Sequence, residues 1–340
     1  FILTFYYGER GGFGSRHHRG MCERSTQVTD RERRKGMEGT LQKEIEEWKR
    51  KRNAVILAHN YQRGEVQDLA DFTGDSLELS MKAASLDCEV LVFCGVRFMA
   101  ETAKILSPSK TVLLPVLEAG CPMADMISRE ELEAFKQKHP GAVTVCYVNS
   151  TAEVKAECDI AVTSANAERI VSQLPSDRDI LFIPDRHLGA FVQSRTGRRM
   201  VLWPGYCPTH ARITPRDIQE LRKSYPDAVV LVHPECPLDT LAEADEVLST
   251  GGMCAYVRTS QAKRFIIATE LGILHRLKKE NPHAEFIPVS SQAICPNMKR
   301  IQVEDVLRSL KQMEHPIELS REVLRNAELP LRRMLAGRIE

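Results

Sequence analysis

Three cysteines at nearly equal intervals constrain the fold of this chain more than any other feature of its sequence. Cys121, Cys207 and Cys295 lie 86 and 88 residues apart (207 − 121 and 295 − 207), and each follows an apolar run and precedes a proline. A repeat of about 87 residues predicts three similar units, each of which presents one thiolate to a shared centre. Thiolates favour soft metals and iron–sulfur clusters, and three protein ligands leave one metal position open for chemistry.

Two further landmarks recur in the same order. Each unit opens with an apolar run that ends at a polar residue, and a hydroxyl residue follows at a turn. The polar residues are His59, Asn149 and His233, and the hydroxyl residues are Ser76, Ser164 and Thr250, the last preceded by Ser249. The offsets within the units are 17, 15 and 17 residues (76 − 59, 164 − 149 and 250 − 233). Three landmarks in three units indicate a true internal repeat.

Short apolar runs alternate with helical patterns along the chain, which calls for parallel sheets covered by helices on both faces. The predicted strands are 54–58, 90–94, 111–114, 143–148, 160–162, 180–183, 200–203, 228–232, 246–248, 264–268 and 285–288. The predicted helices are 76–86, 97–106, 128–138, 166–173, 215–224 and 270–280, with another that starts from Thr40 as its N-cap. We therefore predict three pseudo-threefold-related αβα sandwich repeats around a central metal centre, where loops after the strands bind ligands.

The repeats divide the chain as follows: 39–122 ending at Cys121, 123–209 containing Cys207, 210–297 containing Cys295, and a C-terminal helical segment at 298–340. Residues 1–38 mix Gly, Arg and His without a periodic pattern, and acidic residues argue against an organelle transit peptide. We expect this stretch to be a disordered or non-native extension, with Met21 or Met37 as the native start.

Composition excludes several classes of function. Hydrophobic residues make up 43% of the chain and charged residues 27%, which is typical of a soluble globular protein. The net charge of +1 gives no electrostatic reason to expect nucleic acid or a membrane as a partner. The ten cysteines are not spaced as a secreted disulfide framework, so we expect a reducing, cytoplasmic location.

The landmarks together suggest a chemistry. The turn hydroxyls precede predicted helices, whose N-terminal N–H groups accept anions. Tyr61, Tyr147 and Glu235 lie two residues to either side of the strand-end polar residues and are candidates for acid–base catalysis. A Lewis-acidic metal beside anion-binding hydroxyls and proton donors suits dehydration or condensation of small carboxylates and phosphates.

Each element also has a simpler interpretation. A serine before a helix is usually only an N-cap, and a lone strand-end histidine is more often structural. Cys236 also precedes a proline, but it follows His233 instead of ending a unit, so we leave it out of the centre. Structural zinc would need close cysteine pairs, which the three equally spaced positions do not provide.

The motifs resemble those of the quinolinate synthase family, NadA. The resemblance rests on 58–62, 74–76, 95–101, 147–150, 163–167 and 233–237, and it extends over about residues 41–335. It implies a threefold-repeat αβα fold with a [4Fe-4S] cluster ligated by Cys121, Cys207 and Cys295. It also implies condensation of iminoaspartate with dihydroxyacetone phosphate to quinolinate, with loss of phosphate and two waters, in de novo NAD biosynthesis.

The resemblance further implies which residues act in the site. His59, Tyr61 and Glu235 would be catalytic, and Tyr61 and Glu235 are our candidates for proton transfer. Substrate would be bound by His59, Ser76, Tyr147, Asn149, Ser164, His233, Glu235, Ser249 and Thr250. His210, three residues after Cys207, would support that ligand.

Several alternatives stay open on the sequence. We expect a transient contact with the enzyme that makes iminoaspartate. The sequence does not give the oligomeric state. The chain could instead be an aconitase-like hydro-lyase for another small hydroxy acid, or a non-catalytic iron–sulfur sensor. The sequence also does not assign individual proton transfers among Tyr61, Tyr147 and Glu235.

Overall fold

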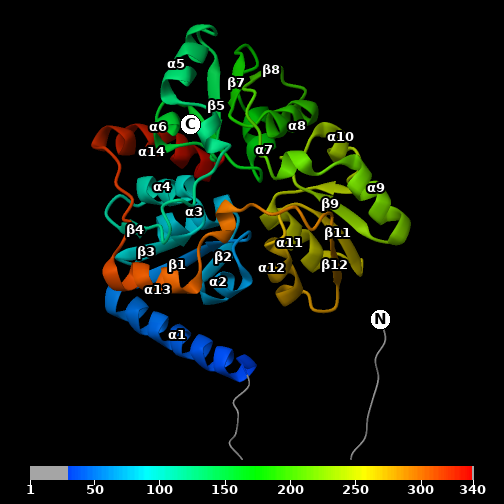
Figure 1. Ribbon diagram of the computed structural model, residues 1–340. Coiled ribbons are helices and arrows are strands. Elements are labelled where there is room, and N and C mark those ends of the chain that lie inside the picture. Colours follow the sequence, from blue (N-terminus) through cyan, green and yellow to red (C-terminus); the bar gives the residue numbers. More distant parts are fainter. Residues whose placement is uncertain (1–29, 339–340) are drawn as a thin grey trace, which may run out of the picture. The chain divides into compact units, whose positions relative to one another are not determined.

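Three four-stranded parallel sheets form the framework of the chain. The computed structural model describes residues 30–338, and the described chain from Thr40 onward forms one compact unit. The strands are β1 (Ala54–His59), β2 (Phe72–Gly74), β3 (Val90–Cys94) and β4 (Thr111–Leu113), then β5 (Val143–Tyr147), β6 (Ile160–Val162), β7 (Ile180–Ile183) and β8 (Met200–Leu202), then β9 (Val229–Val232), β10 (Glu246–Val247), β11 (Arg264–Ala268) and β12 (Glu285–Pro288). Each set of four makes its own sheet (Figure 1).

The three sheets share one topology. Their orders are β2-β1-β3-β4, β6-β5-β7-β8 and β10-β9-β11-β12, so the first strand of each set always lies between the second and the third. All paired strands are parallel. Identical order in three consecutive segments confirms the predicted threefold repeat of α/β units.

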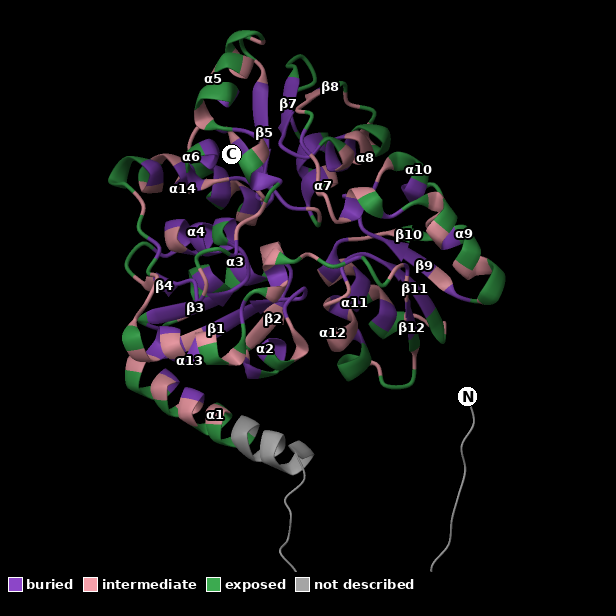
Figure 2. Ribbon diagram, viewed as in Figure 1, coloured by how far each residue is buried: buried purple, intermediate pink, exposed green. Residues whose placement is uncertain are grey.

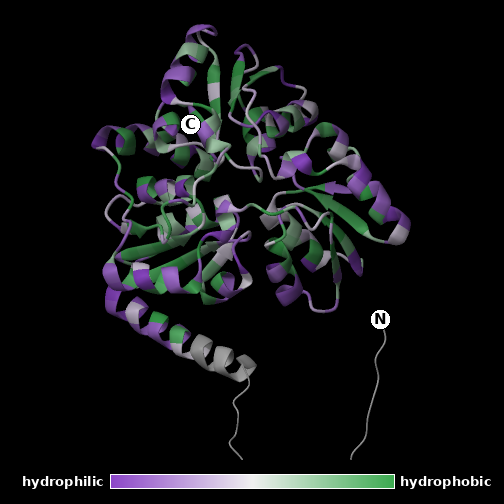
Figure 3. Ribbon diagram, viewed as in Figure 1, coloured by the Kyte–Doolittle hydropathy of each residue, from purple (hydrophilic) through white to green (hydrophobic). Residues whose placement is uncertain are grey.

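Helices cover the sheets. In order they are α1 (Asp30–Arg52), α2 (Gly64–Leu69), α3 (Ser76–Ser85), α4 (Arg97–Leu106), α5 (Arg129–Gln137), α6 (Ala152–Lys155), α7 (Ala167–Ser172), α8 (Arg186–Thr196), α9 (Pro215–Ser224), α10 (Leu238–Leu241), α11 (Thr250–Thr259), α12 (Ile273–Glu280), α13 (Val303–Gln312) and α14 (Arg321–Ala336). In the first repeat α3 and α4 pack together on one face of the sheet, and α2 and α13 pack together on the other. Because both faces are covered, the inner strands, such as β1, β3, β5 and β7, are mostly apolar and buried, as Figures 2 and 3 show.

One hydrogen bond recurs at the start of every sheet. The aspartate directly before the second strand accepts from the backbone N–H of a residue 15 positions earlier, which is the second or third residue of the first strand. The pairs are Asp71 with Ile56 (2.8 Å), Asp159 with Thr144 (2.7 Å) and Asp245 with Val230 (2.7 Å). Each aspartate therefore sets where its edge strand joins the central strand.

The sequence predicted most elements but not all. The eleven predicted strands are present, whereas β2 was missed because Phe72–Gly74 has no apolar run and is only partly buried. The short helices α2, α6 and α10 and the longer α8 were also missed, whereas α11 begins at Thr250, where a helix was expected after the turn hydroxyl. Both ends of helix α8 could have been predicted from the sequence. Asp185 caps its start, and Gly197, with a φ of 66°, follows its end.

The predicted start of the first helix was wrong. Helix α1 begins at Asp30, so Thr40 lies inside it and is not its N-cap. The helix was predicted from Leu41, Ile45 and Trp48, whose spacing of i, i+4 and i+7 begins only at its middle. Residues 1–29 lie outside the described residues, and the extension and the repeat boundaries proposed from the sequence stay predictions. Within residues 30–338, no helix combines the length and apolarity needed to cross a membrane.

Candidate active site

One cavity collects side chains from all three repeats. The first repeat contributes His59, Tyr61, Ser76 and Cys121, the second Tyr147, Asn149, Ser164 and Cys207, and the third His233, Glu235, Thr250 and Cys295. These are the residues that the sequence singled out, with one exception. Ser249 does not line the cavity: its hydroxyl accepts from the N–H of Gly252 and bonds Asp75 at 3.2 Å instead.

Parallel strands explain why residues so far apart in sequence meet. His59 and Tyr147 are the last residues of β1 and β5, and His233 directly follows β9. These three strands hold equivalent positions in their sheets, so their carboxyl ends open toward the same region. Ser76 and Thr250 are the first residues of α3 and α11, which places their hydroxyls and helix N-termini beside the strand ends.

The three cysteines sit in similar local structures. Each is followed by proline and then by a one-turn 3₁₀ helix: Ala124–Met126, His210–Arg212 or Asn297–Lys299. Backbone N–H groups of these turns point at the sulfur atoms. They come from Met123 and Ala124 at Cys121, from His210 at Cys207, and from Asn297 and Met298 at Cys295. Such N–H···S bonds stabilise a thiolate and are a known means of tuning metal-bound sulfur.

Burial makes these thiols poor acids on their own. It raises the pKa of Cys121 to about 12, and it also raises the pKa of Cys207 and of Cys295. The thiols also oppose each other's ionisation, since a Cys295 thiolate raises the pKa of Cys121. Three such groups become thiolates together only beside a strong positive charge, so the donor set fits a metal centre of soft character.

The spacing of possible ligands separates two kinds of metal centre. Among residues 39–338, the donor atoms of Cys207, His210 and Glu235 lie within 4.8 Å of one another, as a single ion would need. The three cysteines are not such a close group, although they line one cavity. Wider spacing of thiolates suits a polynuclear cluster, which presents separate metal corners to its ligands.

A buried carboxylate lies at the centre of a hydrogen-bond network. Glu235 accepts from the Tyr147 hydroxyl at 2.5 Å and from the Asn149 amide at 3.4 Å, and Nδ1 of His210 lies 2.8 Å from its other oxygen. Burial alone would raise the pKa of Glu235, but His210, His233 and Tyr147 outweigh it and lower that pKa. Glu235 is therefore ionised at neutral pH and can accept a proton.

Both tyrosines are neutral hydrogen-bond donors. Burial, reinforced by the nearby charge of Glu235, holds the pKa of Tyr61 and of Tyr147 well above the usual value. The Tyr61 hydroxyl lies 2.5 Å from the hydroxyl of Thr269, which in turn is 2.8 Å from Nε2 of His210. Hydrogen bonds thus run without a break from Tyr61 through Thr269 and His210 to Glu235 and Tyr147.

The strand-end histidines are fixed in one tautomer. Nδ1 of His59 accepts from the N–H of Tyr61, and Nδ1 of His233 accepts from the N–H of Glu235. Burial lowers the pKa of each to about 3, so both rings are neutral at physiological pH. A neutral ring that accepts at Nδ1 carries its hydrogen on Nε2, which makes each histidine a donor.

Sequence reasoning missed some residues of the cavity. Glu270 lines it and accepts from the N–H of Cys295 (3.2 Å) and of Gly272 (2.7 Å), while Lys299 pairs with it at 2.9 Å. Thr269 and Glu270 directly follow β11, so a search for polar residues after the third strand of the unit would have found them. Asp75, which caps α3, was quoted only as part of a motif.

Fold and cavity together define a class: a triplicated parallel α/β enzyme with a three-cysteine centre suited to a metal cluster. The family profile described as quinolinate synthetase A protein, NadA, matches residues 43–336. A quinolinate synthase of Dehalococcoides mccartyi is 58% identical over 291 residues, which cover 86% of this chain and 96% of that protein. Those of Geobacter sp. (strain M21) and Thermus thermophilus are 53% and 52% identical, and each alignment covers 87% of this chain and 97% of the relative. The chain therefore belongs to the NadA family of enzymes.

Proposed function

We propose that the chain condenses iminoaspartate with dihydroxyacetone phosphate to quinolinate, with loss of phosphate and two waters, in de novo NAD biosynthesis. One observation carries the proposal: a single cavity combines three thiols, an ionised carboxylate against a tyrosine, and hydroxyls at helix N-termini. The names of the relatives, all quinolinate synthases, support it.

The cofactor is part of the proposal. Cys121, Cys207 and Cys295 would hold a [4Fe-4S] cluster, for which their soft donors, wide spacing and N–H···S bonds are suited. When bound, it would supply a Lewis acid at its open iron for a substrate hydroxyl or carboxylate oxygen.

The protein's own residues would divide the remaining work. Glu235 would take a proton, because its carboxylate is ionised and buried, and Tyr61 or Tyr147 would donate one from a neutral hydroxyl. His59 and His233, as neutral Nε2 donors, would bind substrate carboxylates. Ser76, Ser164 and Thr250 would bind phosphate or carboxylate oxygens together with the adjacent helix N-termini.

No lysine or arginine lines this cavity within the described residues. Anionic substrates would therefore be held by neutral donors and by the cofactor. Free thiols and an iron–sulfur cluster suit a reducing compartment, so we also propose a cytoplasmic location. There the protein would meet the enzyme that produces iminoaspartate.

The test begins with anaerobic purification and a count of iron and sulfide. We expect about four irons per chain, lost in Cys121→Ala, Cys207→Ala and Cys295→Ala. Cys236→Ala should keep them, because Cys236 is fully buried and does not line the cavity. Quinolinate formation from iminoaspartate and dihydroxyacetone phosphate is then assayed.

Other outcomes would point elsewhere. One zinc or iron per chain that depends on His210 would favour the close group of Cys207, His210 and Glu235 over a cluster. A cluster without turnover of dihydroxyacetone phosphate would favour a hydro-lyase or a sensor.

A further inference from the structure

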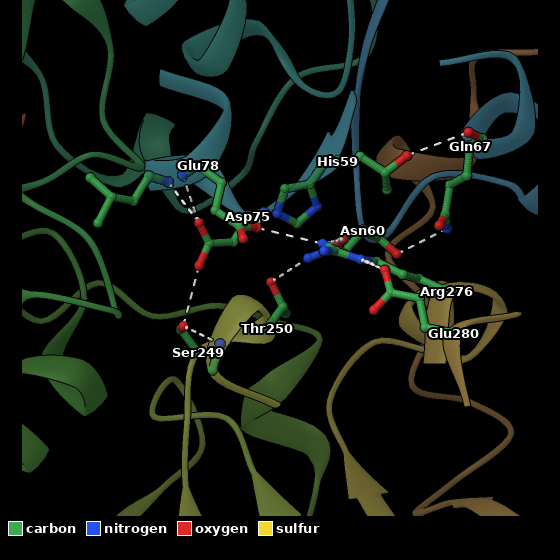
Figure 4. A network of polar contacts seen from close by, with 12 residues as sticks. His59, Asn60, Gln67, Asp75, Glu78, Ser249, Thr250, Arg276 and Glu280 are labelled. Atoms are coloured by element: carbon green, nitrogen blue, oxygen red, sulfur yellow. Dashed lines mark hydrogen bonds and ion pairs between the residues drawn. The ribbon is translucent and has the colours of Figure 1, made fainter. Parts of the chain in front are cut away.

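A short hydrogen-bond relay reaches Thr250 from outside the cavity. The Asn60 amide nitrogen donates to the Thr250 hydroxyl oxygen at 3.0 Å, and a terminal nitrogen of Arg276 donates to the Asn60 amide oxygen at 2.9 Å (Figure 4). Asn60 belongs to the first repeat, and Thr250 and Arg276 belong to the third. Asn60 is fully buried and Thr250 is 3% exposed, so water does not compete for these bonds.

The relay fixes the direction of every bond in it. A guanidinium only donates, so the Asn60 oxygen must face Arg276 and its NH₂ group must face Thr250. The Thr250 oxygen therefore accepts from Asn60, and its single hydrogen is left to point elsewhere. Because Thr250 lines the cavity at the start of α11, that hydrogen is available to a ligand there.

The outer end of the relay is itself held in place. Nε of Arg276 donates to Glu280 at 2.7 Å, and the same terminal nitrogen that reaches Asn60 lies 3.5 Å from Glu78. Gln67 donates to the backbone oxygen of Asn60 at 3.1 Å. Arg276 has a side chain only 14% exposed, yet it does not line the cavity. These contacts hold Arg276 and the Asn60 backbone in place, so the amide oxygen of Asn60 keeps facing the guanidinium.

We propose that Asn60 and Arg276 are positioning residues that make Thr250 a permanent hydrogen-bond donor to an anionic oxygen of the substrate. A threonine hydroxyl can normally donate to a neighbour or accept from it, but here Asn60 can only donate to its oxygen, so the hydroxyl hydrogen stays available to a ligand. No lysine or arginine is among the described residues that line the cavity. Through Asn60 and Thr250, the guanidinium of Arg276 polarises the hydrogen bond to the anion without contacting the anion itself. The inference rests on the proposed function, and the anionic oxygen could be that of a phosphate or of a carboxylate.

Asn60→Asp tests the proposal by reversing the relay with almost no change in shape. One new carboxylate oxygen would accept from Arg276, and the other would take the Thr250 hydrogen. We expect the KM for one substrate to rise about 10- to 100-fold, as for losing a hydrogen bond to a charged group. The KM for the other substrate should stay near its original value. A rise for dihydroxyacetone phosphate would identify the phosphate as the partner, and a rise for iminoaspartate would identify a carboxylate.

A double-mutant cycle separates this role from a structural one. Thr250→Val should raise the same KM, and Asn60→Asp combined with Thr250→Val should be hardly worse than Thr250→Val alone. Arg276→Met, which frees the Asn60 amide to turn, should raise that KM by a smaller factor. Arg264→Met removes a partly exposed arginine paired with Asp227 and Glu285 in the same repeat, and it should leave both KM values unchanged.

Two results would overturn the inference: unchanged KM values in Asn60→Asp and Arg276→Met, or additive losses of kcat and both KM values in the cycle. Calorimetric titration with inorganic phosphate and with succinate measures anion binding without turnover. Wild-type protein that binds these anions but makes no quinolinate would refute the proposed function alone. Weaker binding of one anion to Asn60→Asp would still support the relay.

Discussion

Burial decides the protonation of single residues in the cavity. His59 and His233 are neutral because water cannot reach them to solvate a charge, and each ring accepts a backbone N–H at Nδ1. Glu235 is equally buried but ionised, because the donors around it outweigh the burial. A neutral ring and an ionised carboxylate thus lie two residues apart in the same buried site, because only Glu235 has enough donors around it to offset burial.

The histidines should make stability depend on pH. Each has a pKa near 6.5 when unfolded and about 3 when folded, so the unfolded chain binds more protons between these values. Their contribution to stability is complete above pH 6.5 and is lost as the pH falls toward 3. From pH 7 to pH 5 we expect a loss of about 2 kcal/mol per histidine. Urea unfolding of the anaerobic protein at both pH values measures it.

His59→Asn and His233→Asn should each remove one histidine's share of that pH dependence. His283→Asn, at an exposed histidine, controls for the loss of a histidine as such. Equal pH dependence in wild type and both cavity variants would show that the buried rings are not neutral.

Glu235→Gln should reduce kcat by about 100- to 10,000-fold, the range for a lost acid–base group. The amide cannot take a proton, although it can still accept the Tyr147 hydrogen bond. Steady-state rates of quinolinate formation measure the effect, with Glu220→Gln, an exposed partner of Arg216, as control. A kcat close to wild type would remove Glu235 from the proton-transfer step.

At the scale of elements, the same two local arrangements occur once in each repeat. A 3₁₀ turn after each Cys-Pro aims N–H groups at sulfur, and an aspartate before each second strand holds the opening of the central strand. The cysteine was visible in the sequence because its proline and apolar flank repeat. The aspartates were equally regular but were overlooked, since a lone acidic residue in a loop usually faces solvent.

Asp159→Ala should lower the free energy of unfolding by about 1–3 kcal/mol, the cost of leaving the Thr144 N–H unpaired in the sheet. Asp159→Asn keeps a carbonyl acceptor and should cost less. Urea denaturation of both variants gives the difference. Equal losses in the two would mean that the acceptor oxygen is not what matters.

At the scale of the whole molecule, the segment after the third repeat returns to the first two. After α13, Ile317 donates its backbone N–H to Val112 of β4 at 2.8 Å. Helix α14 then packs beside α4, α6 and β6 (Figure 1), where Arg333 donates to the Asp159 carbonyl. This segment ties the first and second repeats together.

Leu331→Ala in α14 should cost about 2–5 kcal/mol of unfolding free energy, because Leu331 is fully buried and the change leaves a cavity. Leu329→Ala is the matched control two residues earlier, where the leucine is 54% exposed and little should change. The two urea midpoints should therefore separate clearly. Coinciding midpoints would show that α14 does not stabilise the repeats.

The sequence by itself determined the repeat, the parallel sheets and the residues that gather at their ends. These depend on local patterns, such as apolar runs, caps and a Cys-Pro that recurs, which any stretch of chain carries with it. Only the tertiary structure decided which ends meet. Tyr147 and Glu235 are 88 residues apart and Asn60 and Arg276 are 216 apart, and no local pattern couples them. Their contacts arise from the packing of three sheets around one cavity, which fixes distance and burial together.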